Sequence, residues 1–203
     1  MSRLPVVALI ATAVAAGCGS SPKHMSAPIS TQSSTATTAT DTGPGALQAE
    51  ANSAAAGDIP DNQVFLVFRN GAAAYSIKYP EGWARRGSAA TVVFRDKNNI
   101  VRIAVGRAPA STPAAAAHDL SRLRGVHVVS APRRLTLAGK PAVKVTYSTI
   151  SAPNAVTGKR VTLVVDRYYL SSNGRRAVVD LGTPQGVDNV DAYRLMIESF
   201  RWR

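Results

Sequence analysis

The chain has 203 residues, of which 45% are hydrophobic and 6% aromatic, and its formal net charge is +12. A single cysteine excludes an intramolecular disulfide framework. Residues 61–203 hold 22 of the 24 lysines and arginines and nine of the 12 acidic residues. This excess of positive charge favours acidic partners and also serves solubility.

The first hydrophobic segment is typical of a bacterial lipoprotein signal peptide. Arg3 gives a short basic start, residues 4–16 are apolar, and small residues immediately precede Cys18. A signal peptidase needs small side chains in its narrow cleft, and a lipid transferase needs an accessible thiol. We therefore predict that residues 1–17 are removed and that Cys18 carries acyl chains. These chains would anchor the protein at the extracytoplasmic face of the cell membrane.

Two other interpretations of this segment stay open. A transmembrane anchor is disfavoured because 13 apolar residues fall short of the roughly 20 that cross a bilayer. A plain secretory signal with an incidental cysteine is the second alternative. Ala15 supports it, because lipoprotein signals usually carry Leu, Val or Ile three residues before the cysteine.

Residues 18–60 are predicted to form a flexible tether. Serine, threonine and alanine dominate residues 30–40, and Gly43, Pro44 and Gly45 interrupt regular structure. Such a segment cannot bury enough apolar surface to offset its ordering entropy. A coil of about 42 residues spans an r.m.s. distance of about 35–40 Å. This reach suits a domain held near a membrane or peptidoglycan.

Residues 61–203 have the pattern of one globular domain, large enough to bury about two thirds of its extended-chain surface. Period-two alternation with β-branched and aromatic residues predicts seven or eight strands. These are residues 63–69, 74–79, 91–95, 100–107, 126–129 with 133–137, 143–150, 161–170 and 175–181. Asn173 and Gly174 supply the positive φ angles of a tight hairpin between the last two.

Two helices are expected among these strands. Residues 112–124 are alanine-rich and end at Gly125, and Pro113 stands at a first helical position after a Ser or Thr cap, Ser111 or Thr112. Residues 187–199 carry an apolar stripe that includes Val190 and Ile197. Two helices among strands joined mostly by short turns predict an α+β domain with an antiparallel sheet.

No residue pattern identifies a catalytic or metal site. Of the histidines, only His118 and His127 could share a metal, and only if folding brings them together. No serine lies in a Gly-x-Ser-x-Gly elbow, and no glycine loop for phosphate is present. Asp166 and Asp180 could face each other across a hairpin as paired carboxylates, but salt bridges to neighbouring arginines are favoured. We therefore expect no enzyme, cofactor or metal.

Basic residues at predicted strand ends and turns are the candidate partner-binding residues. Alternate strand ends of a meander gather at one edge, so some of them should cluster. Trp83 belongs to the set because tryptophan favours an apolar–polar boundary, although packing into the core is its alternative. The set is Trp83, Arg85, Arg86, Arg133, Arg134, Lys159, Arg160, Arg175 and Arg176. Export, and the lack of an aromatic-rich binding sheet or helix-turn-helix motif, argue against nucleic acid.

Several motifs, in the same order along the chain, resemble the PsbP-like domain family. Residues 75–83, YSIKYPEGW, resemble its Y-x-I-x-Y-P-x-G-W strand and turn, and residues 92–101 resemble its next hairpin. Residues 137–147 are similar to its L-x-G-x-P-A-x-x-V-x-Y strand pair, and residues 197–201 to its terminal helix ending. The resemblance spans essentially all of residues 63–202.

This resemblance implies an αβα sandwich around a central antiparallel sheet. The family includes the extrinsic photosystem II protein, a nuclear transport factor that binds a small GTPase, and exported actinobacterial lipoproteins of the LpqN type. None of these is known for catalysis, and no metal or cofactor residues carry over to this chain. The lipid signal and the tether make it look most similar to the LpqN-type lipoproteins.

We therefore expect a lipid-anchored, non-catalytic PsbP-like domain that binds an anionic envelope component or a membrane protein. One alternative is an envelope hydrolase or transferase, which predicts a deep pocket with a carboxylate or a serine–histidine pair. The other is a purely structural lipoprotein, which predicts scattered positive charge and no concave site.

Overall fold

The structure, a computed structural model, describes residues 56–154 and 158–203. The predicted leader, Cys18 and tether residues 18–55 lie outside this range. Ile59, which the expected boundary assigns to the tether, is buried in the core of the folded domain at 8% exposure. No helix in the described ranges is long and apolar enough to cross a bilayer.

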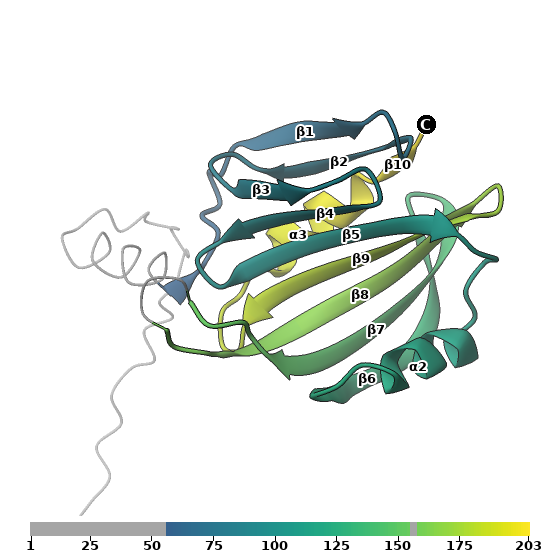
Figure 1. The fold of residues 1–203 in the computed structure, drawn as a ribbon. Helices are drawn as coiled ribbons and strands as arrows, with labels where there is room; N and C mark the ends of the chain where they lie inside the picture. The colour runs from purple at the N-terminus through teal and green to yellow at the C-terminus, as the bar shows by residue number, and fades with distance from the viewer. Residues whose placement is uncertain (1–55, 155–157) are drawn as a thin grey trace, which may run out of the picture. The chain divides into compact units, whose positions relative to one another are not determined.

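The larger of two antiparallel sheets has seven strands, in the order β3-β4-β5-β9-β8-β7-β6 (Figure 1). Each strand pairs antiparallel with its neighbours, as the short connections predicted. The strands are β3 Ala84–Gly87, β4 Thr91–Asp96, β5 Asn99–Arg107, β6 Val126–Leu137, β7 Lys140–Ile150, β8 Thr162–Ser172 and β9 Arg175–Pro184.

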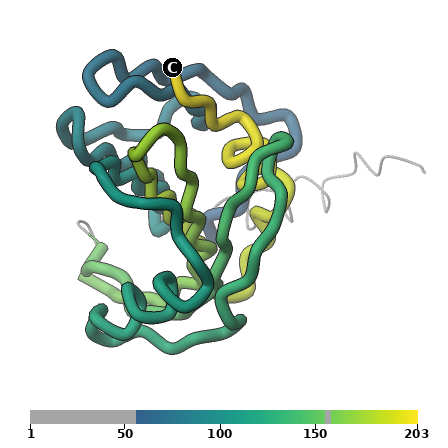
Figure 2. Tube along the Cα trace, turned by 90° about the vertical axis from the view of Figure 1, so that its right-hand side faces the viewer, coloured from purple at the N-terminus to yellow at the C-terminus, as the bar shows by residue number. Residues whose placement is uncertain are grey.

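The smaller sheet joins the first described strands to the end of the chain. It has the order β1-β2-β10, with β1 Phe65–Asn70, β2 Tyr75–Pro80 and β10 Arg201–Trp202. Figure 2 shows the yellow C-terminal segment running beside these blue strands. The stacked rings of Tyr75 and Phe200, with centroids 5.4 Å apart, hold the C-terminal segment against β2.

Two helices cover opposite faces of the large sheet (Figure 1). Helix α2, Pro113–Ser121, buries Ala116 and Leu120 against one face. The predicted Thr112 cap is confirmed, because its hydroxyl oxygen accepts a hydrogen bond from the backbone of Ala115 at 3.1 Å. Helix α3, Val190–Glu198, buries apolar side chains, among them Met196, against the other face. This arrangement confirms the expected α+β class and αβα layering.

The hairpin between β8 and β9 also follows the sequence prediction. Asn173 and Gly174 have φ angles of 50° and 72°, a left-handed pair that matches the right-handed twist of the flanking strands. Ser172 consequently faces Arg175 in the ladder, and the register continues to Leu163 opposite Pro184.

Three elements differ from the prediction. Strand β3, Ala84–Gly87, was not expected because all four of its residues are exposed and none is a large apolar residue. The short strand β10 forms only because β2 offers it a pairing edge. Residues 126–137 form one continuous strand, whose two register irregularities lie in the stretch predicted to be interrupted.

A basic cleft on the open half of the sheet

Helix α2 covers only part of its face of the large sheet, since it packs against residues of β6, β7 and β8. The part of this face formed by β3 and β4 carries a cleft of about 670 Å³. Its lining combines a small apolar floor with basic and backbone-rich walls. The lining residues are Gly82, Ala84, Arg86, Val93, Arg95, Asp96, Lys97, Pro153 and Asn154.

Strand register brings two arginines together in this cleft. Arg86 of β3 lies opposite Val93 of β4, and Arg95 lies opposite Ala84. Arg86 and Arg95 are therefore diagonal neighbours on one face, a separation of about 7–8 Å between their backbones. Both are exposed, and neither side chain forms a hydrogen bond or ion pair with another described residue. Val93 between them is half-buried and forms the apolar floor.

The hairpin between β4 and β5 adds one lysine and one carboxylate to the rim. Lys97 adopts a left-handed backbone conformation, with φ of 50°, in the two-residue turn that connects Asp96 to Asn99. Among the described residues that line the cleft, Asp96 is the only acidic one. Three basic side chains against one carboxylate leave the lining with a net positive charge.

The opposite wall is the loop that follows β7. Asn154 donates its backbone N–H to the carbonyl of Lys159 at 2.8 Å, which closes the loop. The Arg160 guanidinium donates to the Ser151 carbonyl at 3.2 Å and fixes the base of the loop. Lys159 and Arg160 are both exposed and follow this wall along the loop, but neither lines the cleft. Among the described residues, Arg86 is the one predicted partner-binding residue that lines it.

A buried charge network adjoins the cleft. Arg102 of β5 faces Val93, and its guanidinium lies 3.7 Å from the Asp180 carboxylate. Arg167 holds the same carboxylate with two hydrogen bonds of 2.5 and 2.8 Å, and both side chains are almost fully buried. Burial alone would lower the pKa of Arg167, but the hydrogen bonds and charge of Asp180 raise it overall.

The remaining predicted residues lie elsewhere. Trp83 is buried at 8% exposure, which agrees with the core-packing alternative and leaves its ring unavailable at the surface. Arg85 points to the opposite face, where its guanidinium stacks on Phe68 at 5.2 Å. Arg133 and Arg134 lie on β6, at the other edge of the large sheet.

Arg175 and Arg176 make contacts within the fold. The Arg175 guanidinium lies 4.7 Å from the Trp202 ring and donates to the Ala73 carbonyl at 3.3 Å. Arg176 lies 3.5 Å from the Asp119 carboxylate of α2. The predicted set is therefore not one patch, because the sheet register separates its members.

The cleft includes Arg95 and Lys97, which the sequence prediction missed. The alternation of residues along β4 did indicate that Val93 and Arg95 lie on one face, opposite to Val92 and Phe94. It could not predict that Arg86 lies beside Arg95, because β3, the strand that carries Arg86, was itself not predicted.

The two aspartates considered as paired carboxylates lie on opposite faces of the sheet. Asp180 faces Arg167, whereas Asp166 faces Leu181. Asp166 forms an ion pair with Lys144 at 2.7 Å and accepts a hydrogen bond from Thr146 at 2.6 Å. The expected salt bridge to a neighbouring arginine is confirmed for Asp180, whereas Asp166 pairs with a lysine instead. These carboxylates cannot act as a pair. No group of three or more candidate metal ligands occurs among the residues that the structure describes.

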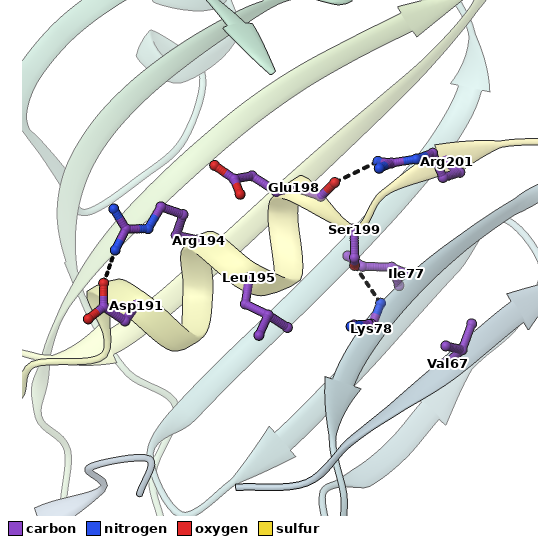
Figure 3. Close-up of a pocket in the computed structure, with 9 residues that line it drawn as sticks. All are labelled: Val67, Ile77, Lys78, Asp191, Arg194, Leu195, Glu198, Ser199 and Arg201. Atoms are coloured by element: carbon purple, nitrogen blue, oxygen red, sulfur yellow. Dashed lines mark hydrogen bonds and ion pairs between the residues drawn. The ribbon is translucent and has the colours of Figure 1, made fainter. Parts of the chain in front are cut away.

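Further hollows border α3. One, of about 460 Å³, lies between α3 and strands β6, β7, β8 and β9, with the Lys144–Asp166 pair in its wall. Another, of about 610 Å³, lies between the start of α3 and residues 58–65, and the charged residues of its lining are all acidic. A third is a groove of about 520 Å³ between α3 and the small sheet (Figure 3). In this groove the Lys78 backbone N–H donates to the Ser199 hydroxyl at 2.7 Å, and Arg194 pairs with Asp191. Three basic and two acidic side chains line this groove, so its positive excess is smaller than that of the cleft on β3 and β4, where three basic side chains meet one acidic one.

No protein family and no curated protein matches the chain by sequence. Its fold is similar to the solution structure of cyanobacterial PsbP from Synechocystis sp. PCC 6803. That match has a TM-score of 0.50 and 15% identity, and it covers 72% of this chain and 98% of the other.

Two further structures are more distant. The Ran-binding protein Mog1p of Saccharomyces cerevisiae has a TM-score of 0.46 and 10% identity, over 70% of this chain and 96% of its own. LpqN of Mycobacterium tuberculosis, a protein involved in cell envelope biogenesis, has a TM-score of 0.35 and 18% identity. It covers 69% of this chain and 84% of its own. The fold of residues 56–154 and 158–203 is thus PsbP-like, whereas the LpqN-type branch stays a prediction.

Proposed function

We propose that this chain is a non-catalytic, lipid-anchored protein of the cell envelope, and that its basic cleft binds an anionic envelope component. The proposal is carried by Arg86 and Arg95, diagonal neighbours with no acidic partner among the described residues. Two guanidinium groups that extend from neighbouring positions on one face repel each other, and an anion bound between them removes that cost. Guanidinium groups also match phosphate and carboxylate oxygens in geometry.

The chemistry of the lining favours binding over hydrolysis. Its nine residues include no serine, cysteine or histidine, and Asp96 is the only carboxylate. A hydrolase needs a nucleophile or a pair of acid–base groups in reach of the substrate. An open, basic wall with an apolar floor suits instead a charged headgroup or an anionic polymer that carries some apolar surface.

A titration of the full chain with inorganic polyphosphate, followed by calorimetry, tests the cleft. Each basic residue near an anionic surface contributes about 1 kcal/mol, so the double variant Arg86→Gln/Arg95→Gln should bind about 30-fold more weakly. The matched control is Arg133→Gln/Arg134→Gln, which removes the same charge from β6 and should bind nearly as well as the unmodified chain. Equal weakening in both variants would assign the binding to net charge and overturn the cleft.

Salt dependence gives a second readout on the same titration. Screening reaches a Debye length of about 10 Å at 0.1 M salt, so the affinity should fall steeply as salt is added. Capture that is insensitive to salt contradicts an anionic ligand.

The anchor is tested separately. Mass spectrometry of the native protein should find an acylated Cys18 as the first residue. An unmodified terminus with residues 1–17 attached would refute the anchor and leave the cleft to be judged by the titration.

A further inference from the structure

Strand β1 presents an unpaired edge. In the described residues it pairs only with β2, and Glu81 donates its backbone N–H to the Val64 carbonyl at 2.8 Å. Because the hydrogen-bonding direction alternates along an antiparallel strand, the backbone groups of Phe65, Val67 and Arg69 point away from β2. The edge thus offers three N–H donors and three C=O acceptors in a row.

The side chains along this edge are mostly apolar. Val67 is 47% exposed and Leu66 is 39% exposed, and Val64 just before the strand is 55% exposed. Arg69 is the only charged residue of the strand. A six-residue apolar edge of this kind is a template for pairing with another strand.

The other sheet edges carry features that oppose such pairing. Strand β3 has only four residues and two of them are arginines. Strand β6 contains Pro132, the Arg133–Arg134 pair and two register irregularities. Strand β10 has two residues. Charge, proline, irregularity and shortness are the usual protections of an edge, and β1 has none of them except Arg69.

We propose that β1 pairs antiparallel with β1 of a second copy of this chain, with Val67 opposite Val67 across a two-fold axis. In this register the outward backbone groups of all three positions meet their counterparts. Arg69 of each copy lies opposite Phe65 of the other, which places a cation beside an aromatic ring and keeps the two arginines apart. Leu66 lies opposite Phe68. The strand is therefore complementary to itself in charge and in apolar character.

The groove beside β1 extends this contact surface. Val67 of β1 and Leu195 of α3 both line it, and Leu195 is 39% exposed (Figure 3). Residues that face each other in a ladder lie on the same side of the sheet. The two Val67 side chains and the two α3 helices would therefore lie on one side of the joined sheet, where Leu195 adds apolar area next to the new strand pair. Because both copies use the same surface, the contact is isologous, and the assembly is complete as a dimer.

Sedimentation velocity of the full chain in detergent, from micromolar to sub-millimolar concentration, tests the proposal. The unmodified chain should dimerise, and Val67→Arg should be monomeric because it places two like charges in contact. Val128→Arg is the matched control, since Val128 is 59% exposed on the irregular edge strand β6. A control variant that dissociates, or an unmodified chain that stays monomeric throughout, overturns the proposal.

Hydrogen exchange of the unmodified chain keeps the test decisive if Val67→Arg fails to fold. The amides of Phe65, Val67 and Arg69 should exchange at least ten-fold more slowly at high than at low concentration. The same amides with concentration-independent exchange would show that β1 stays unpaired. Slowing only when a foreign acidic or apolar peptide is added would assign the edge to another partner and refute self-pairing.

Discussion

The buried ion pair between Arg167 and Asp180 gives a quantitative prediction about stability. Both residues are 6% exposed, and the guanidinium meets both carboxylate oxygens at 2.5 and 2.8 Å. Removing one partner from such a pair leaves a buried charge and costs about 3–5 kcal/mol. Replacing both partners with apolar residues of similar size is often nearly neutral. Comparing the single and double variants therefore separates the cost of desolvating the two charges from the attraction between them.

The structure ranks the single variants. In Arg167→Met the Asp180 carboxylate still lies 3.7 Å from the Arg102 guanidinium. Because the Arg102 side chain is 46% exposed, it offsets only part of the cost of burying the Asp180 charge. We expect a loss of about 3 kcal/mol, the lower end of the range. In Asp180→Val the Arg167 guanidinium loses both carboxylate contacts and keeps only neutral neighbours among the described residues, such as the Tyr147 hydroxyl at 3.4 Å. We expect a loss of about 4–5 kcal/mol there.

Urea unfolding followed by circular dichroism measures these losses as a shift of the midpoint at constant slope. Arg167→Met should also lower the melting temperature by roughly 10 °C. The double variant Arg167→Met/Asp180→Val should be more stable than either single variant. Two results would refute this reasoning: free-energy losses that simply add in the double variant, or a loss of under about 1 kcal/mol in each single variant. Either result would show that neither charge depends on its partner to offset the cost of burial.

Three further predictions test other parts of the fold. Burial and then the charge of Asp180 raise the pKa of Tyr147 to about 12, from 10 in the unfolded chain, so the folded state keeps a proton that the unfolded state loses. The contribution of Tyr147 to the free energy of unfolding should be constant below pH 10 and fall as the pH rises to 12, and Tyr147→Phe should reduce the alkaline loss of stability in urea titrations. Gly87→Ala should lower the free energy of unfolding by about 2–3 kcal/mol, because Gly87 has φ of 107° and a Cβ there would lie 2.2 Å from a backbone oxygen. The control is Gly82→Ala, where φ is 85° but the space is open. It should cost about 1 kcal/mol in the same thermal melt. Asn189→Ala should lower the free energy of unfolding by about 2–4 kcal/mol in chemical denaturation. The reason is that the buried Asn189 amide accepts a hydrogen bond from the backbone of Ile59 and donates to three oxygens. A neutral result would show that water replaces the amide in these hydrogen bonds.

Local signals in the sequence were sufficient for most of the fold. Asn173 and Gly174 predicted the β8–β9 turn because only a left-handed pair fits a two-residue hairpin. Thr112 and Pro113 predicted the start of α2 because a cap and a fixed φ angle act within one turn. The layering then followed from burying an apolar face on each side of the sheet.

The cleft could be predicted only in part, because it depends on pairing between strands. Arg86 was a candidate for its charge alone, but its neighbour Arg95 becomes a neighbour only through the β3–β4 register. Arg175 looked equally available in sequence, yet the C-terminal strand places Trp202 under its guanidinium. Periodicity assigns a residue to a face, whereas the identity of its neighbour on that face is a long-range property.

The size of α2 explains why the sheet face with the cleft is open. Seven strands at about 4.8 Å spacing span about 29 Å, whereas one helix is about 10–12 Å wide. The residues left uncovered must meet water, and arginines could be present for that reason alone. A face selected only for solubility would carry the two signs of charge in nearly equal numbers. The groove in Figure 3 comes close to this balance, with Lys78, Arg194 and Arg201 against Asp191 and Glu198.

The variant Arg95→Glu separates these two explanations. It places a carboxylate diagonal to Arg86, and such a cross-strand pair should stabilise the fold by about 0.5 kcal/mol. If the cleft binds anions, the same variant should lose polyphosphate binding by more than Arg95→Gln does. Its gain in stability would then come at the expense of function, as is common for residues kept for binding. Unchanged binding together with a more stable fold would show that the arginines of this face serve solubility alone.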